Sequence, residues 1–462
     1  MTPRIFGLET EYGIIVARRP GASPTSAREG GELPTVEQAV KLMFEATPNA
    51  FRTTNHFLPN GGRLYVDIGS HPEYASAECV RLDDLVANDQ AGDRFVQDLA
   101  DTANAVLAER GVPAGIHVLR NNADSFGQTF GCHENYSASR SSDFGHLIRT
   151  LTALLVTRPI LTGCGDLIAE ADGSTRFVVS TRSEHIATTS SADPTKERPL
   201  VNTKDEPHAD RTRWRRLHVI SGDSSMAETT TALKAGWTAL VLDLAEHGGS
   251  LDDLLPEDPM AAMRIVNRDI TGRARFTTVE GRQLSALDVQ REILSRVLDR
   301  GIAEDHQARW VVDLVTRSLD ALASGNLDRI GTELDWVVTW RLLQRQRERT
   351  GVDWGHASLA RLVLAIRDLS PTAGLAGRLR ASGQMAAYCT AEQLQDALTN
   401  PPTTTRARVR GKFVGWAAER GYRASVDWSH VRLDGPIRPQ IDLLDPFASR
   451  SGDVAALLAE LS

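Results

Sequence analysis

Residues 4–16 read RIFGLETEYGIIV, and this stretch decides the fold that we predict for the chain. Its aromatic and β-branched residues are typical of a strand. Side chains alternate across a strand, so Glu9 and Glu11 share one face while Leu8 and Thr10 share the other. The Cα atoms of the two glutamates would lie about 6.6–7 Å apart. The stretch therefore predicts a sheet with one apolar face and one acidic face.

A second stretch, FLPNGGRLYVDIG at 57–69, predicts two short strands around a turn at residues 60–62. In the second strand, alternation places Arg63, Tyr65 and Asp67 on one face and two apolar residues on the other. The apolar face can pack on helices while the polar face presents a cation, a phenol and a carboxylate. The polar face of such a sheet can form the base of an active site.

Two more carboxylates, Glu73 and Glu78, follow in residues 71–78, HPEYASAE. Magnesium prefers oxygen ligands, commonly a few carboxylates together with water and phosphate oxygens. The acidic strands therefore suggest a magnesium site. From the pattern alone, a half-exposed sheet whose polar face simply meets water explains the residues equally well.

The rest of the chain mixes strands and helices without regular β-α-β alternation, which predicts an α+β fold on an antiparallel sheet. Helical spacing is found at 36–46, 83–111, 146–157, 226–246 and through most of 285–350, and strand patterns at 115–120, 177–181 and 216–221. An apolar stripe is typical of core packing, and consists of Leu327, Ile330, Leu334, Val337 and Val338. Pro401-Pro402 predicts a break before a C-terminal module of roughly 60 residues.

Composition narrows the class of protein. The 462 residues carry a net charge of −8, so nothing suggests a general nucleic-acid binder. The four cysteines form no C-x-x-C pair, the N-terminus lacks the apolar core of a signal peptide, and no apolar run is long enough to span a membrane. We therefore expect a cytoplasmic protein. Phosphate-loop, dinucleotide-fingerprint, nucleophile-elbow and H-E-x-x-H motifs are all missing, so a bound nucleotide would depend on carboxylate-held metal and arginines.

Two further clusters favour a functional site over a merely solvated sheet. Residues 121–136 include NNADS and GCHENY, and residues 202–219 include NTKDEPHAD and RWRRLHV. Both are dense in side chains that bind metals, phosphates or amides, which core strands would not require.

These clusters carry a resemblance to a known family. The stretches GLETEYG, NGGRLYVDIGSHPEYASAEC, NNADSFGQTFGCHENY, NTKDEPHAD, RRLHVISGD and PPTTTRARVRGKF closely resemble the Pup–protein ligases (proteasome accessory factor A). That family is related to glutamine synthetase and to glutamate–cysteine ligases, and the resemblance runs from residue 4 to about 448. It implies a glutamine synthetase-like catalytic domain at 1–398 and a small C-terminal domain at 399–462 that contributes to the nucleotide site.

The resemblance also implies a reaction. With ATP and Mg²⁺ as cofactors, such an enzyme phosphorylates the C-terminal glutamate of the acidic, disordered tag Pup. A lysine of a substrate protein then displaces the phosphate, and the isopeptide bond marks that protein for proteasomal degradation. Neither nucleic acid nor membrane is an expected partner.

The matching motif positions imply roles for individual residues. Glu9, Tyr65 and Glu73 would lie at the magnesium site, and Asp67 would be the catalytic base. The residues expected to contact ATP are Arg63, Ser76, Arg216 and Trp428.

Two alternatives stay open from the sequence. The first is the Pup deamidase and depupylase of the same fold, but that family carries a long insertion that the 54 positions between Glu9 and Arg63 cannot contain. The second is a catalytically reduced, tag-binding paralogue, because Lys204 replaces the usual arginine and residues 192–199 and 366–374 depart from the family pattern. Tag-binding candidates with basic charge are Arg341, Arg345, Arg347 and Arg349, although a solvated helix face explains that run more simply.

Overall fold

A large sheet organises the molecule. The structure, a computed structural model, describes residues 3–19, 33–45, 55–67, 69–124, 127–435 and 440–461. Within these residues, eight strands form one sheet in the order β10-β11-β12-β7-β1-β5-β4-β3. The strands are β1 (Phe6–Glu11), β3 (Asn55–Phe57), β4 (Arg63–Asp67), β5 (His71–Ala75), β7 (Cys132–Ser139), β10 (Thr188–Ser191), β11 (Pro199–Asn202) and β12 (Trp214–Val219).

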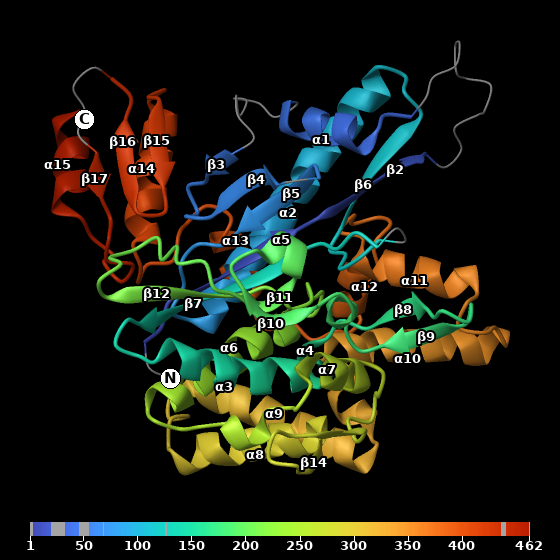
Figure 1. The fold of residues 1–462 in the computed structure, drawn as a ribbon. Helices are drawn as coiled ribbons and strands as arrows, with labels where there is room; N and C mark the ends of the chain where they lie inside the picture. Colours follow the sequence, from blue (N-terminus) through green and yellow to red (C-terminus); the bar gives the residue numbers. More distant parts are fainter. Residues whose placement is uncertain are drawn as a thin grey trace.

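All neighbouring strands of this sheet are antiparallel except β10 and β11, which are parallel. The predicted α+β class, an antiparallel sheet with flanking helices, is therefore confirmed (Figure 1).

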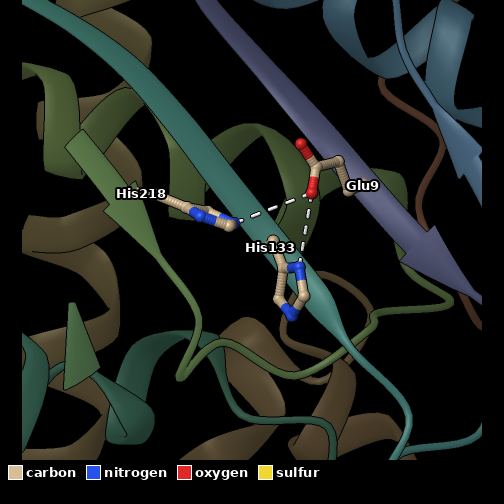
Figure 2. A group of neighbouring side chains, drawn as sticks. All are labelled: Glu9, His133 and His218. Atoms are coloured by element: carbon tan, nitrogen blue, oxygen red, sulfur yellow. Dashed lines mark hydrogen bonds and ion pairs between the residues drawn. The ribbon is translucent and has the colours of Figure 1, made fainter. Parts of the chain in front are cut away.

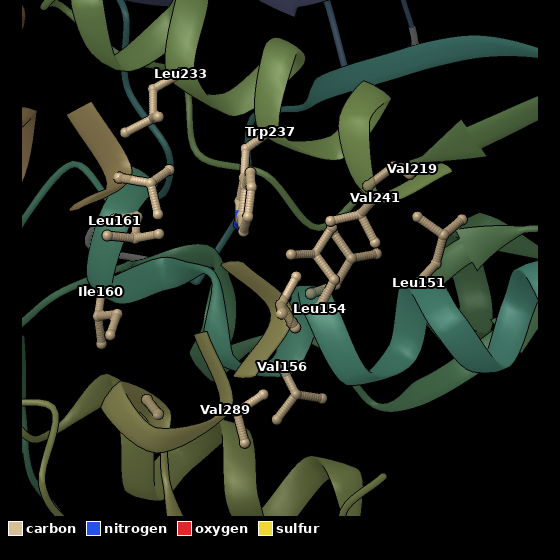
Figure 3. Packing of buried hydrophobic residues seen from close by; sticks show 14 of the residues in the cluster. Leu151, Leu154, Val156, Ile160, Leu161, Val219, Leu233, Trp237, Val241 and Val289 are labelled. Atoms are coloured by element: carbon tan, nitrogen blue, oxygen red, sulfur yellow. The ribbon is translucent and has the colours of Figure 1, made fainter. Parts of the chain in front are cut away.

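Helices cover one face of the sheet. The helices nearest to it are α2 (Leu82–Glu109), α3 (Phe144–Thr157) and α6 (Glu228–Glu246), and Figure 1 shows α3 and α6 between the sheet and the outer helices α8 (Ala286–Asp299) and α9 (His306–Ser324). Leu8 and Leu217, from β1 and β12, belong to the same buried core as Leu151 and Trp237. Figure 3 shows Trp237 among the leucines and valines of this core, and its indole Nε1 donates to Gln290 Oε1 at 2.8 Å. The apolar face predicted from Leu8 is therefore the face that packs on helices.

The remaining described elements surround this sheet and the helices that cover it. The helices are α1 (Val36–Glu45), α4 (Pro159–Thr162), α5 (Pro194–Glu197), α7 (Pro259–Asn267), α10 (Asp335–Thr350), α11 (Ala357–Arg367), α12 (Ala376–Ala381) and α13 (Ala391–Asp396). Two-stranded ribbons pair β2 (Gly13–Arg18) with β6 (Ala114–Leu119), β8 (Asp166–Ala169) with β9 (Thr175–Val178), and β13 (Arg275–Thr277) with β14 (Gln283–Ser285). The predicted apolar stripe near α10 is in the core as expected, with Ile330, Leu334 and Val337 fully buried.

The stretch at 4–16 forms two strands where the pattern predicted one. β1 ends at Glu11 and β2 begins at Gly13, and β2 pairs with β6 outside the main sheet. Tyr12 lies between them, fully buried in a second core, with its hydroxyl donating to Asp93 Oδ1 at 2.9 Å. The chain leaves the main sheet where this ring turns inward, which alternation alone does not reveal.

The central strand β7 was missed in the sequence because a charged residue lies on its buried face. Burial alternates along the whole strand, with Cys132, Glu134, Tyr136 and Ala138 inward. Glu134 is fully buried and pairs with Arg158 at 2.6 Å. A carboxylate in an inward position hides the apolar–polar alternation that normally identifies a strand.

A C-terminal segment lies beside the β3 edge of the sheet (Figure 1, red). It contains α14 (Ala407–Glu419), β15 (Ala424–Asp427), β16 (His430–Leu433), β17 (Ile441–Asp442) and α15 (Gly452–Glu460). It has its own small apolar cluster, which includes Phe413, Val431 and Leu457. The domain boundary at 398/399 stays a prediction. Among the described helices, none is both long and apolar enough to cross a membrane.

The buried core should respond strongly to truncation. Leu154 is fully buried between the sheet and the outer helices, so Leu154→Ala should lower the free energy of unfolding by about 2–5 kcal/mol. Urea unfolding followed by circular dichroism measures this change. Leu298→Ala is the matched control, because Leu298 is 50% exposed and should change stability by about 0.5 kcal/mol or less. Equal losses for both variants would contradict the assignment of Leu154 to the core.

Candidate active site on the polar face of the sheet

Strand register brings the predicted site residues together. Glu73 on β5 lies opposite Glu11 on β1 and, on its other side, opposite Tyr65 on β4. Directly opposed residues have Cβ atoms about 4.5–5.5 Å apart, so the three side chains form a row across three strands. Glu9 lies two residues before Glu11 and opposite His133 on β7. The face predicted from alternation is thus continuous across β7, β1, β5 and β4.

Glu9 is held by two histidines and an amide. Figure 2 shows His133 from β7 and His218 from β12 both approaching the same oxygen of its carboxylate. His133 Nδ1 lies 3.3 Å and His218 Nε2 3.6 Å from Glu9 Oε2, while Asn135 Nδ2 donates to Oε1 at 3.1 Å. Arg216 Nη2 donates to His218 Nδ1 at 2.8 Å. Because Arg216 can only donate, the neutral His218 ring carries its proton on Nε2, the atom that faces Glu9.

A second group of carboxylates lies beside the first. One oxygen from each of Glu11, Asp67 and Glu73 falls within 4.8 Å of the others. His71 Nδ1 lies 3.1 Å from Glu11 Oε2, and the Tyr65 hydroxyl bonds to the Glu73 carboxylate. Asp67, at the end of β4, is partly exposed, whereas Glu73 is 3% exposed. The group thus combines a buried acid with an accessible one.

The electrostatics separate these carboxylates. Burial raises the pKa of Glu9, but the hydrogen bond from His133, the neighbouring His218 ring and the charge of Arg216 outweigh it, so the Glu9 pKa is lowered. For Glu73, burial and the neighbouring charges of Glu9 and Glu11 all raise the pKa, well above its ordinary value. Burial has the opposite effect on a histidine, because the charged form is the protonated one. It lowers the pKa of His218 well below its ordinary value, which keeps the ring neutral. Glu9 is therefore an anion, while Glu73 needs either a proton or a cation beside it.

The donor set fits a divalent cation bound together with an anionic ligand. Three carboxylates at this spacing repel one another, and a hard cation relieves that repulsion while using oxygen ligands. Two buried polar atoms next to Glu9, His218 Nε2 and Asn135 Oδ1, have no hydrogen-bond partner. Buried polar groups are normally paired, so an unpaired donor and acceptor here indicate a place for a ligand.

A pocket opens next to this cluster, between the sheet and the C-terminal segment. It is lined by Glu9 and Ser76 from the sheet side, by Arg216 from β12 and by Trp428 from the β15–β16 turn. Gly7 also lines it, and a Cβ at Gly7 would come within 3.3 Å of Ser76 Oγ. The pocket therefore joins an aromatic wall to a polar floor that ends at Glu9.

Ser76 lines this pocket and Arg63 does not, and both side chains already use part of their bonding capacity. The Ser76 hydroxyl accepts from Leu8 N at 2.9 Å and donates to Ala77 O at 3.1 Å, so only a lone pair is left for a ligand. Arg63 donates from Nε to Asn55 Oδ1 at 2.8 Å, and its guanidinium lies 4.4 Å from the Tyr65 ring centroid. Arg63 is thus ordered beside the acidic row.

Comparison with known proteins identifies the family. The Pup-ligase protein family matches this sequence over residues 4–432. The chain belongs to the Pup-ligase family. It is 42% identical to the Pup–protein ligase of Sanguibacter keddieii, 40% identical to that of Rhodococcus erythropolis and 39% identical to that of Mycobacterium tuberculosis, covering 100% of this chain and of each relative.

Two solved structures share this Pup-ligase fold. The crystal structure of the complex between the prokaryotic ubiquitin-like protein Pup and its ligase PafA aligns with a TM-score of 0.91 at 32% identity, covering 100% of this chain and 91% of that one. The structure of the Pup ligase PafA in complex with ADP aligns with a TM-score of 0.83 at 33% identity, covering 96% of this chain and 97% of that one.

Several residues of the site had no assigned role from the sequence. His133 and Asn135 were visible only as members of a polar cluster, because the strand that carries them was not predicted. Glu11 was placed on the correct face without a function, and His218 needed the β12 register to reach Glu9.

The arginines of α10 lie on a helix that the sequence did predict, and there Arg341 bonds Gly331 O and Arg347 lies over Trp354. Their role toward the tag stays a prediction.

Glu78, past the end of β5, forms a buried ion cluster at the pocket wall. Arg406 Nε donates to Glu78 Oε1 at 2.7 Å and Arg410 Nη1 to the same oxygen at 2.9 Å, while Arg410 Nη2 bonds the other oxygen. Burial raises the pKa of the Glu78 carboxyl, but Arg410 and Arg406 outweigh it and lower the pKa to about 2 from 4.5. The cluster keeps Glu78 charged and links the sheet to α14.

The low pKa of Glu78 predicts a pH-dependent contribution to stability. A lowered folded-state pKa stabilises the protein above about pH 4.5, and this stabilisation is lost as the pH falls toward 2. The shift corresponds to about 3 kcal/mol. Free energies of unfolding of wild type and Glu78→Gln should therefore differ most above pH 5 and converge toward pH 2.

Chemical denaturation across this pH range measures the difference. Glu419→Gln is the control, because the side chain of Glu419 is 77% exposed and its removal should leave the pH profile unchanged. A constant gap between wild type and Glu78→Gln at every pH would count against the ion cluster.

Proposed function

We propose that this chain uses the polar face of its sheet to join the C-terminal glutamate of Pup to lysines of other proteins. The chain is an ATP-dependent Pup ligase, as its family, its full-length relatives and the PafA structures with Pup and with ADP support. The observation that carries the assignment of the site is the convergence of Glu9, Tyr65, Asp67 and Glu73 beside the pocket of Trp428.

ATP would occupy the pocket between the sheet and the C-terminal segment. Trp428 offers an aromatic face for the base, which stacking favours. Arg216 lines the pocket next to Glu9, where it can bond phosphate oxygens, and the His218 ring, to which its guanidinium donates, lies 3.6 Å from Glu9. Ser76 can accept one hydrogen bond from the nucleotide.

Magnesium would bind where the acidic row and Glu9 meet. Glu9 and Glu73 supply carboxylate oxygens, and Tyr65 bonds Glu73 and so orients it. Glu11 is a further candidate ligand, because its carboxylate belongs to the same group as Asp67 and Glu73. When bound, magnesium neutralises charge on the phosphates and on the transferred phosphoryl group.

Activation of the tag is the first chemical problem. A carboxylate is a poor electrophile, and phosphorylation of the C-terminal glutamate converts one of its oxygens into a leaving group. Charge gathers on the transferred phosphoryl group, so a fixed cation beside it lowers the barrier. Arg63 stands next to Tyr65 at the acidic row and would supply that charge.

The attacking amine is the second problem. A free lysine has a pKa of about 10.4, so releasing its proton at pH 7 costs roughly 4–5 kcal/mol. Asp67 is partly exposed at the end of β4, where an incoming lysine can reach it, and lies within the acidic group. Its carboxylate would take the proton as the nitrogen attacks the acyl phosphate.

Hydrolysis by a Pup deamidase is the rival activity. The full-length relatives at 39–42% identity are Pup–protein ligases, which favours ligation. Lys204, which departs from the family pattern, lies on the surface in an ion pair with Glu206 at 2.7 Å.

Incubation with a glutamine-ended tag separates the two activities, because a deamidase releases ammonia and a ligase does not. ATP turnover with a glutamate-ended tag in turn separates a working ligase from a binding-only paralogue.

Replacing Asp67 tests the base. Asp67→Asn should retain nucleotide binding and lose Pup ligation by about two orders of magnitude or more, because the amide cannot accept the lysine proton. A gel-based conjugation assay with purified tag and a lysine-bearing client measures the rate, and calorimetry with ADP and magnesium measures binding. Asp442→Asn is the control, since Asp442 is exposed on β17. Near-normal conjugation by Asp67→Asn would remove Asp67 from this role.

Replacing Glu9 tests the metal site. Glu9→Ala should raise the magnesium concentration needed for half-maximal activity by about tenfold or more, because a ligand carboxylate is lost. Titrating magnesium at saturating ATP measures this shift in the ligation rate. An unchanged magnesium dependence, with activity altered in some other way, would argue against metal binding by Glu9.

A further inference from the structure

The ion cluster at Glu78 reaches the aromatic wall of the pocket. Beyond its two bonds to Glu78, Arg410 donates from Nη1 to Trp428 O at 3.1 Å and from Nη2 to Gly61 O at 2.8 Å. Its guanidinium carbon lies 4.8 Å from the Trp428 ring centroid and 5.2 Å from that of Phe57. The two rings meet edge to face with centroids 4.9 Å apart. One fully buried guanidinium therefore contacts the backbone and the ring of the same tryptophan.

Arg406 has a different set of contacts, although it binds the same carboxylate. Its Nη1 donates to Leu443 O at 2.8 Å, and its backbone N donates to Pro446 O at 3.1 Å. The neighbouring Thr405 Oγ1 donates to Glu78 O at 2.7 Å. Arg406 thus connects Glu78 to the chain that follows β17, whereas Arg410 connects Glu78 to Trp428 and to the β3–β4 turn.

The junction under Arg410 leaves little freedom of movement. A Cβ at Gly411 would come within 2.2 Å of Pro59 O, so α14 lies directly on the turn between β3 and β4. Gly61, in that turn, has a φ of +83° and accepts from Arg410. The same turn leads into Arg63 on β4. Arg410 therefore connects Trp428 to the β3–β4 turn, and through this turn to β4.

We propose that Arg410, held by Glu78, is a positioning residue that fixes the ring of Trp428 at the wall of the nucleotide pocket. The inference rests on the proposed function, because it assigns the pocket to a nucleotide. Lysine at position 410 would keep the charge but lose the planar fork that serves Glu78, Gly61 and Trp428 together.

A double-mutant cycle on nucleotide binding tests this inference. Calorimetry with ADP and magnesium on the full chain gives the dissociation constants of wild type, Arg410→Lys, Trp428→Leu and the double variant. Loss of a stacked aromatic contact should weaken binding by about tenfold in each single variant. If Arg410 acts through Trp428, the double variant binds no more weakly than the weaker single variant.

Two results would overturn the proposal: wild-type affinity in Arg410→Lys, or a double variant whose loss equals the product of the single losses. Arg420→Lys is the matched control, because Arg420 lies in the same segment, contacts Trp416 and should leave ADP affinity unchanged. If circular dichroism shows that Arg410→Lys is unfolded, Glu78→Asp replaces it in the cycle, with the same outcomes expected.

The same samples distinguish this inference from the proposed function. A wild-type chain that binds ADP but does not conjugate Pup contradicts the function and leaves the cycle readable. A chain that conjugates Pup but shows additive losses contradicts only the role of Arg410.

Discussion

The structure depends on the antiparallel pairing of β1 with β7 on one side and β5 on the other. Backbone hydrogen bonds set the register, and the register decides which side chains share a face. Glu9 thereby meets His133, and Glu11 meets Glu73. A slip of one residue in either pairing would turn the carboxylates into the helical core and Leu8 into the pocket. The apolar packing against α3 and α6 opposes such a slip, so the core on one face protects the chemistry on the other.

The polar face gathers charges that would separate if they were free in water. Glu9 is offset by His133, His218 and Arg216, whereas Glu73 has acidic neighbours and a raised pKa. Such an arrangement is destabilising by itself and is typical of functional sites, where a bound cation or substrate supplies the missing charge. By contrast, Glu78 and Glu134 are buried with arginines, and these pairs join different elements of the fold. The fold therefore contains two kinds of carboxylate away from bulk water. Glu78 and Glu134 are paired with arginines and hold elements together, whereas the clustered carboxylates of the polar face lack enough positive charge until a ligand binds.

Polar contacts of the paired kind also attach the C-terminal segment to the sheet. Its apolar cluster is small, and its attachment to the sheet relies on the polar contacts around Glu78 together with the close approach of α14 to the β3–β4 turn. A polar attachment is directional, because hydrogen bonds specify angles as well as distances. It can therefore fix a single ring, Trp428, in a way that an apolar interface of similar size would not.

The sequence by itself determined the α+β class, the helices at 83–111 and 226–246, the shared strand face of Glu9 and Glu11 and, separately, that of Arg63, Tyr65 and Asp67. These features are local, because they follow from side-chain periods of 2 and 3.6 residues along one segment. Tertiary structure alone decided that β7 is a strand, that Glu134 turns inward to Arg158, that His218 reaches Glu9, and that Arg410 meets Trp428. The physical reason is that a buried charge is stable only beside its partner, and that partner lies on another element of the fold, 24 residues away for Glu134 and Arg158 and 332 for Glu78 and Arg410.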